Sequence, residues 1–218
     1  MRERIVEAMA RISAIPGAFI DRGVIQGPTS IPVEMQRHPQ MWTATDEATV
    51  AATIASLRAY WTDVDAWLVP NRLPDDFRFF LEFYGGLAID QADYFFNIYG
   101  FGLSSPYRYE SILDGDDSLY EHGWLAIGML SLKDETQPHY GQLVHFFTDL
   151  VGNMRQGCVI AVPTWGCHDL SHEPHALLSD VAAHKGCWTK VADSFTEWLE
   201  LAAQTRGTFD YIKSKTAA

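Results

Sequence analysis

The sequence predicts an α+β domain in which helices flank a mostly antiparallel sheet. One amphipathic helical pattern begins at Pro74 and a second begins at Ser194. Between them the spacing of apolar residues shifts toward two, in short runs of aromatic and β-branched residues bounded by glycine. Helix, several strands and helix in this order are typical of the α+β class rather than of alternating α/β folds.

Residues 1–45 are predicted to form an N-terminal extension, and residues 46–218 the α+β domain. Apolar residues at helical spacing predict a short amphipathic helix over residues 3–14. The passage from Pro16 to Pro39 holds several prolines and glycines, so we expect an irregular wrap or linker there rather than a core element. The pattern leaves open whether the extension completes the core or forms a separate arm.

The first helix of the predicted domain carries signals for both of its ends. Pro74 suits the first helical position, where its missing N–H costs nothing. Asp75 and Asp76 suit the first turn, where the helix dipole favours negative charge. One apolar stripe follows, made of Phe77, Phe80, Leu81 and Tyr84. A glycine pair at positions 85 and 86 then ends the helix, because glycine readily adopts the left-handed conformation.

Four runs between the helices are predicted to be strands, because apolar side chains alternate in them. They are residues 94–99, 123–130, 142–149 and 158–162. The last helix begins with a capping box, in which Ser194 caps the first turn and Glu197 reaches back to it. The apolar face of this helix comprises Phe195, Trp198, Leu199 and Ala202.

Four of these segments, in this order, resemble the SUKH superfamily, which includes fungal glucan-synthesis regulators and many bacterial immunity proteins. They are the leucine-proline helix that ends in a glycine pair (Leu73–Gly86), the Trp-Leu-x-Ile-Gly strand (Gly123–Gly128), the strand that begins at Gly141, and the Ala-Asp-Ser-Phe helix (Val191–Leu199). The resemblance covers roughly residues 70–206. It implies a SUKH-like sheet between the two helices and a protein that binds another protein without catalysing a reaction.

The charge of the chain is strongly negative and unevenly distributed. The net charge is −12 over 218 residues. Residues 1–45 hold five Arg against four acids, whereas residues 46–135 hold sixteen acids against five bases. Such a surface repels nucleic-acid backbones and anionic membranes and suits a basic partner, for example a nuclease. The simpler interpretation is that the charge serves solubility alone.

A partner-facing edge is predicted where acids and tyrosines gather between the strands. Tyrosine is favoured at recognition sites, and carboxylates complement a basic partner. The residues are Tyr107, Tyr109, Glu110, Asp114, Asp116, Asp117, Tyr120 and Glu121. The acids could instead form a solvated loop, and the tyrosines could fill the core. A calcium loop is excluded, because the twelfth residue from Asp114 is Leu125 rather than the glutamate that closes such loops.

Cysteines and histidines cluster in the C-terminal half of the chain. They are Cys158, Cys167, His168, His172, His175, His184 and Cys187, together with Asp169. Structural zinc needs about four thiolate or imidazole ligands, but these spacings match no zinc ribbon, knuckle or finger. A cysteine nucleophile at Cys167 would need a histidine that meets it in space. We therefore predict no metal, no cofactor and no catalytic residue.

The location expected from the sequence is the cytoplasm. The first turn of the chain is charged, so no secretory signal is expected, and no run approaches the ~20 apolar residues that cross a bilayer. Three cysteines make an odd count without framework spacing, which favours reduced thiols.

The function predicted from these observations is that of a non-enzymatic immunity protein, the antitoxin half of a toxin–antitoxin pair. It would neutralise a cognate basic toxin, a nuclease or other nucleic-acid-acting enzyme, by covering the active site of the toxin. Nucleic acid and membranes are not expected as partners, and the oligomeric state stays open. One alternative is a regulatory protein-interaction module without a toxin partner. Another is a metal-dependent hydrolase built on the Cys/His cluster.

Overall fold

The computed structural model describes residues 1–20, 71–84, 86–99, 122–133, 143–163 and 187–209, together with Thr62, Ala66 and Gly141. In chain order the elements are α1 (Arg2–Ser13), β1 (Ala18–Ile20), α4 (Asp75–Tyr84), β2 (Leu87–Asp90), β3 (Tyr94–Ile98), β4 (Trp124–Leu132), β5 (Leu143–Asp149), β6 (Val159–Pro163), β7 (Thr189–Ala192) and α7 (Phe195–Thr205).

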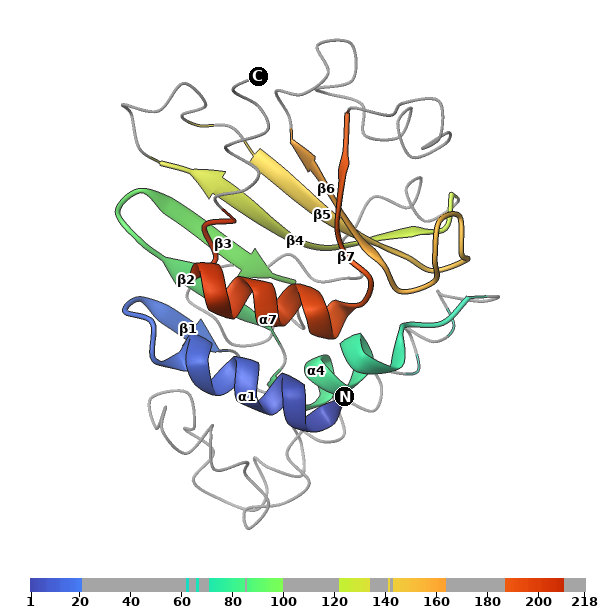
Figure 1. Cartoon of the computed structure of the whole chain (residues 1–218), viewed down its shortest axis with the longest axis horizontal. Coiled ribbons are helices and arrows are strands. Elements are labelled where there is room, and N and C mark those ends of the chain that lie inside the picture. The colour runs from blue at the N-terminus through green and yellow to red at the C-terminus, as the bar shows by residue number, and fades with distance from the viewer. Residues whose placement is uncertain are drawn as a thin grey trace.

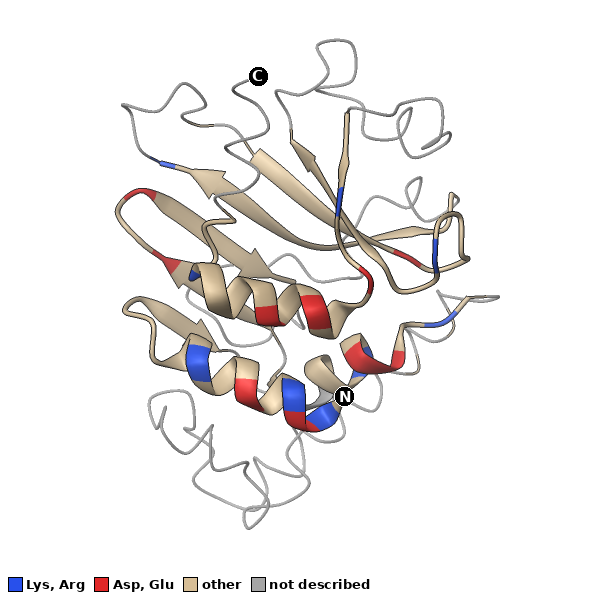
Figure 2. Ribbon diagram, in the orientation of Figure 1, with Lys and Arg blue, Asp and Glu red and all other residues tan. Residues whose placement is uncertain are grey.

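The described strands form one seven-stranded sheet, and each strand is antiparallel to the next one along the chain (Figure 1). The described helices pack together beside this sheet, and its two edges do not meet. This architecture confirms the predicted α+β class and the antiparallel sheet. Figure 2 shows that charged residues lie mainly on the helices and in the connections, whereas the strand interiors carry few.

The first twenty residues belong to the same core as the rest of the described chain. The predicted first helix is confirmed as α1, and its buried face comprises Ile5, Ala8, Met9 and Ile12. The expectation of an irregular passage from Pro16 is wrong for residues 18–20, which form β1 and pair with β2. A three-residue strand is too short to show a period in the sequence. Gly17 permits the pairing, because a Cβ there would lie 2.2 Å from the Asp90 carbonyl oxygen.

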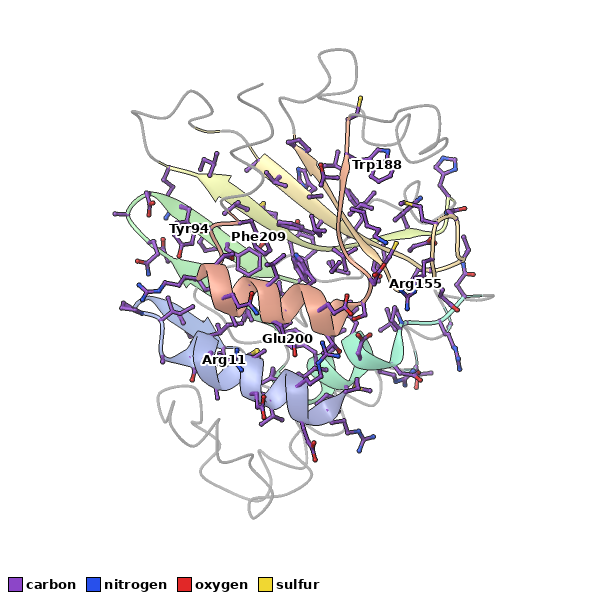
Figure 3. All side chains as sticks on the ribbon, in the orientation of Figure 1. Arg11, Tyr94, Arg155, Trp188, Glu200 and Phe209 are labelled. Carbon is purple, nitrogen blue, oxygen red and sulfur yellow. The ribbon has the colours of Figure 1, made fainter. Side chains whose placement is uncertain are left out.

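The main core lies between the sheet and the helices. Trp198 of α7 packs against Phe96 and Phe146, with ring centroids 5.7 and 4.9 Å away. Phe209 lies over the same face just beyond the end of α7 (Figure 3). The helix approaches the sheet closely at Gly128, where a Cβ would lie 2.4 Å from the Asn97 carbonyl oxygen and 3.1 Å from the Trp198 ring. A larger residue at Gly128 would therefore push the sheet or the indole aside.

The opposite face of the sheet carries a smaller apolar cluster. It comprises Trp124, Phe147, Ile160 and Val162, all buried, with Cys187 and Trp188 packed against them. Neighbouring residues of β5 belong to different clusters, because successive side chains of a strand point to opposite faces. Both faces of the central strands are thus buried, which explains why their apolar runs are nearly continuous.

Candidate protein-binding surface

The structure leaves the predicted partner-facing edge untested. All eight of its residues, from Tyr107 to Glu121, lie outside the described residues. The same holds for the Cys/His cluster between residues 164 and 186. A candidate surface must therefore come from the geometry of the described residues themselves.

The described residues are nearly balanced in charge. They hold nine Lys or Arg and eleven Asp or Glu, a difference of −2. The whole chain holds 16 and 28, a difference of −12. Ten of the twelve excess negative charges consequently belong to residues outside the described part of the chain.

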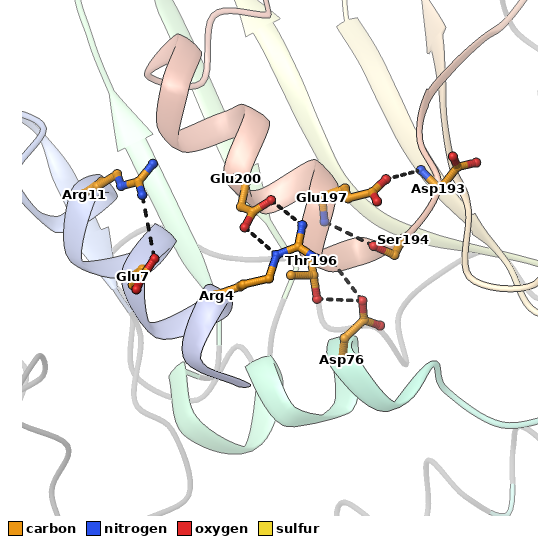
Figure 4. A network of polar contacts seen from close by, with 9 residues as sticks. All are labelled: Arg4, Glu7, Arg11, Asp76, Asp193, Ser194, Thr196, Glu197 and Glu200. Carbon is orange, nitrogen blue, oxygen red and sulfur yellow. Dashed lines mark hydrogen bonds and ion pairs between the residues drawn. The ribbon is translucent and has the colours of Figure 1, made fainter. Parts of the chain in front are cut away.

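The start of α7 is capped by side chains from two helices (Figure 4). The backbone N–H of Glu197 donates to the Ser194 hydroxyl oxygen at 3.2 Å, as the predicted capping box requires. The Glu197 carboxylate accepts a bond from the backbone N–H of Asp193 at 3.0 Å, one residue earlier than predicted. The capping residue is therefore confirmed, and the reciprocal bond is shifted by one position.

A carboxylate of α4 completes the cap of α7. One oxygen of Asp76 accepts bonds from the backbone N–H and the hydroxyl of Thr196, at 2.8 and 2.9 Å. The sequence explained Asp76 by the dipole of its own helix alone. The contact also brings together the aromatic stripes of the two segments, since Phe195 lies 4.8 Å from Phe77 and 5.1 Å from Phe80, measured between ring centroids. This junction joins the two helices and builds the scaffold.

An ion pair on the outer side of the helices joins α1 to α7. The Arg4 guanidinium donates two parallel bonds to Glu200, at 2.7 and 2.6 Å. These bonds lower the pKa of the Glu200 carboxyl and raise the pKa of Arg4. Half of the Arg4 side chain is exposed, so solvent screens the pair and its contribution to stability is small.

The connection between β5 and β6 is organised around a buried carboxylate. Asp149, at the end of β5, is fully buried. One of its oxygens accepts the backbone N–H groups of Val151 and Gly152, at 3.1 and 2.8 Å. The other accepts those of Met154 and Arg155, at 2.8 and 3.2 Å. Four loop donors are thereby satisfied by a single side chain, which fixes the path of the backbone.

Two polar side chains of this loop turn back toward the backbone. The Asn153 amide donates to the carbonyl of His122 at 2.9 Å, and the Gln156 amide donates to the carbonyl of Leu150 at 3.0 Å. The loop also lies close to the start of β4. A Cβ at Gly123 would lie 2.4 Å from the Val151 side chain, so glycine is required there.

The side chains at the tip of this loop face solvent. Residues 151–156 are all exposed. Val151 is 49% exposed and Met154 is 38% exposed; within the part of the chain that the structure describes, Met1 is the other large apolar side chain that is exposed. The apolar spacing of the sequence did not indicate this surface. An aspartate at a strand end followed by Gly152 and Gly157 was the available signal, because such an aspartate often bonds the backbone of a turn.

A shared carboxylate lies beside the loop. Arg155 approaches Asp193 at 3.3 Å, and the Lys190 ammonium also bonds to Asp193. The hydrogen bond from Lys190 is the main cause that lowers the pKa of Asp193. These partners tie the loop to β7 and to the start of α7.

The two described cysteines differ in their redox state. Cys158 is a free, buried thiol, and its pKa is raised by burial and by the negative charge of Asp149. Cys187 is disulfide-bonded, so the expectation of reduced thiols is wrong for this residue. A disulfide sulfur cannot act as a thiolate ligand, and spacing alone does not show which cysteines meet in space. No group of three or more candidate metal ligands occurs among the described side chains.

The longest helix described has 12 residues, and none of the described helices is long and apolar enough to span a membrane. Comparisons of the chain with protein-family models, with curated proteins and with solved structures gave no match. The resemblance to the SUKH superfamily rests on the sequence segments that carry it.

Proposed function

We propose that this protein binds and neutralises a cognate toxin enzyme, as the resemblance to SUKH immunity proteins implies. The observation that carries the proposal is the separation of charge along the chain. Residues 46–135 hold sixteen acids against five bases, and the whole chain has a net charge of −12. An acid excess of this size favours association with a basic protein.

The mechanism of the proposal is electrostatic and steric. A chain this acidic attracts a protein whose active-site cleft is basic because it binds nucleic acid, and charge complementarity speeds their encounter. Once bound, the protein excludes the substrate from the cleft. No step of this mechanism requires a catalytic residue or a cofactor in this protein.

The first test is co-expression with the product of the neighbouring reading frame, with growth and pull-down as measurements. Rescue of growth together with a stable complex supports the proposal. A complex with a neighbouring product that is not toxic would favour the regulatory module instead. If the protein neither binds the neighbouring product nor abolishes its toxicity, the proposal is wrong.

The second test concerns charge. The association rate constant should fall by about tenfold or more between about 50 mM and about 500 mM salt. Replacing Asp114, Asp116 and Asp117 by asparagine should lower it at low salt, whereas replacing the exposed acids Glu3, Glu7 and Asp93 by their amides should lower it less. Equal effects of the two triple variants would show that net charge acts without a localised edge.

The proposal places the protein in the cytoplasm, where an intracellular toxin is met. The disulfide at Cys187 is unusual for a reducing compartment. Counting free thiols in protein purified from the cytoplasm, with and without reductant, tests this part. Three reactive thiols in the unfolded, unreduced protein would show that the disulfide does not form there.

A further inference from the structure

We propose that the disulfide at Cys187 is a redox-sensitive switch for one end of the sheet. While the disulfide is closed, it holds Trp188 and the first residues of β7 in place. Its reduction releases them and uncovers part of the smaller apolar cluster on that face of the sheet. The inference goes beyond the proposed function and does not depend on it.

The disulfide lies next to the side chain that covers this cluster. The residues underneath are almost completely buried, with Trp124 and Ile160 at 0% exposure and Val162 at 8%. Cys187 and Trp188 pack against them and are themselves only partly buried. Trp188 immediately precedes β7, and its indole lies next to the start of that strand (Figure 3). A change at Cys187 therefore acts first on Trp188.

The two ends of β7 are held differently. β7 has four residues and forms an edge of the described sheet, with β6 as its neighbour. Its end leads into α7 through Asp193, which binds both Lys190 and Arg155. Its start pairs Thr189 with Ala161, directly after the disulfide and Trp188. The end of a short edge strand opens locally at low cost, so loss of the disulfide should free the start of β7 and leave α7 in place.

The free thiol of the described chain is insulated from this disulfide. Cys158 is fully buried, and burial raises its pKa, so little of the reactive thiolate forms. Cys158 lies just before β6, beyond the pairing of Val159 with Ala192, whereas Cys187 lies before the other end of β7. Four strand residues separate these levels by about 13 Å, and a disulfide spans at most about 7 Å between Cα atoms.

The partner of Cys187 follows by count. The chain has three cysteines, and Cys158 is free. Cys167, which lies outside the described residues, is therefore the remaining cysteine that can pair with Cys187 within the chain. We expect substitution of either cysteine of this pair to have the same effect.

The switching step is thiol–disulfide exchange with a small thiol reductant. A thiolate of the reductant attacks one sulfur, the protein S–S bond breaks, and a mixed disulfide forms. A second thiol of the reductant then displaces the protein sulfur. Two cysteine thiols result, and the reductant leaves as a disulfide, having supplied two electrons and two protons. A thiol-rich compartment favours the released form, and an oxidising one favours the closed form.

The experiment measures amide hydrogen exchange of the full chain by mass spectrometry, with and without dithiothreitol. Reduction should speed exchange in residues 187–190 by about tenfold or more, and change exchange in α7 by less than about twofold. Cys187→Ser and Cys167→Ser should reproduce the fast exchange without reductant. Cys158→Ala is the control and should keep the response to reductant.

Tryptophan fluorescence gives a second measurement. Reduction should shift the emission to longer wavelength, because the partly buried Trp188 becomes exposed to water. The chain has seven tryptophans, so the shift is assigned with Trp188→Phe, in which it should disappear. A shift of the same size in Trp188→Phe would show that Trp188 is not the residue released.

Each result supports or overturns the switch. Equal exchange of the oxidised and reduced protein would overturn it. Faster exchange throughout α7 would also overturn it, because the disulfide would then hold the whole fold. If Cys187→Ser does not fold, reduction and reoxidation of the wild type still decide, since slow exchange that returns on reoxidation supports the switch. None of these measurements uses a toxin, so their failure leaves the proposed function standing.

Discussion

The junction of α4 with α7 and the loop between β5 and β6 are both fixed by an aspartate, but their apolar side chains point in opposite directions. In each, one aspartate accepts backbone N–H groups that would otherwise lack partners. Asp76 joins two helices whose aromatic side chains turn inward. Asp149 is buried, and the loop that it fixes turns apolar side chains outward.

The difference shows that order and burial are separate properties in this fold. At the junction, polar capping and apolar packing act on the same residues, so both serve stability. At the loop, hydrogen bonds fix the path of the backbone, and the side chains at the tip do not belong to the core. The junction adds to the core, whereas the loop is fixed without adding its tip side chains to the core, and the following changes test that distinction.

The largest expected effect is that of Asp149→Ala. It leaves four backbone N–H groups without their acceptor next to a buried site, and should lower the free energy of unfolding by about 3 kcal/mol. Urea unfolding measures the change, and limited proteolysis should locate new cleavage in residues 150–157. Asp93→Ala, at an exposed carboxylate in the β2–β3 turn, is the control and should stay within about 0.5 kcal/mol. Equal stability of the two variants would mean that the loop is not fixed by Asp149.

Asp76→Ala should have an intermediate effect. It removes two bonds to Thr196 at the start of α7, and loss of a helix cap typically costs about 1–2 kcal/mol. The neighbouring Asp75→Ala should cost less than about 0.5 kcal/mol, since Asp75 is exposed and contributes mainly to the helix dipole. A double-mutant cycle with Thr196→Val isolates the bond to the hydroxyl. A coupling energy near zero would contradict the cross-helix cap.

The partly buried carboxylate Glu200 should show its effect as a dependence of stability on pH. Its pKa in the folded protein lies below its ordinary value of 4.5, chiefly because Arg4 donates hydrogen bonds to it. The stabilising contribution is therefore complete above the ordinary pKa and is lost as the pH falls through the lower, folded value. Glu200→Gln should reduce the loss of stability on acidification, measured by urea unfolding at about pH 6 and about pH 3. An unchanged pH dependence would show that solvent screens the pair completely.

The smallest expected effect on stability belongs to the variant with Val151→Ser and Met154→Ser. Val151 is 49% exposed and Met154 is 38% exposed, so only part of each side chain packs within the fold and the free energy of unfolding should change by less than about 1 kcal/mol. A loss of stability of about 2 kcal/mol or more would show that these side chains pack within the fold, and the comparison between junction and loop would no longer hold.

The sequence predicts well those features that depend on residues close to one another along the chain. The helices at α1, α4 and α7 and the strands β3 to β6 follow from apolar spacing, and Ser194 was identified as a cap. The short strand β1 was predicted to be irregular, and β2 and β7 were not identified, because strands of three or four residues are recognised by their partners rather than by their own period. The acidic and tyrosine-rich edge stays a prediction.

The sequence by itself determined where the helices begin, which faces are apolar and that the chain as a whole is strongly acidic. These properties arise from local backbone preference, periodicity and composition. Only the tertiary structure decided that Asp76 caps a helix 120 residues away and that the Asn153 amide bonds to the carbonyl of His122. Both are contacts between distant parts of the chain, and they exist because sheet register and helix packing bring these groups within hydrogen-bonding distance. The exposure of Val151 and Met154 has the same origin, since burial is a property of the whole fold.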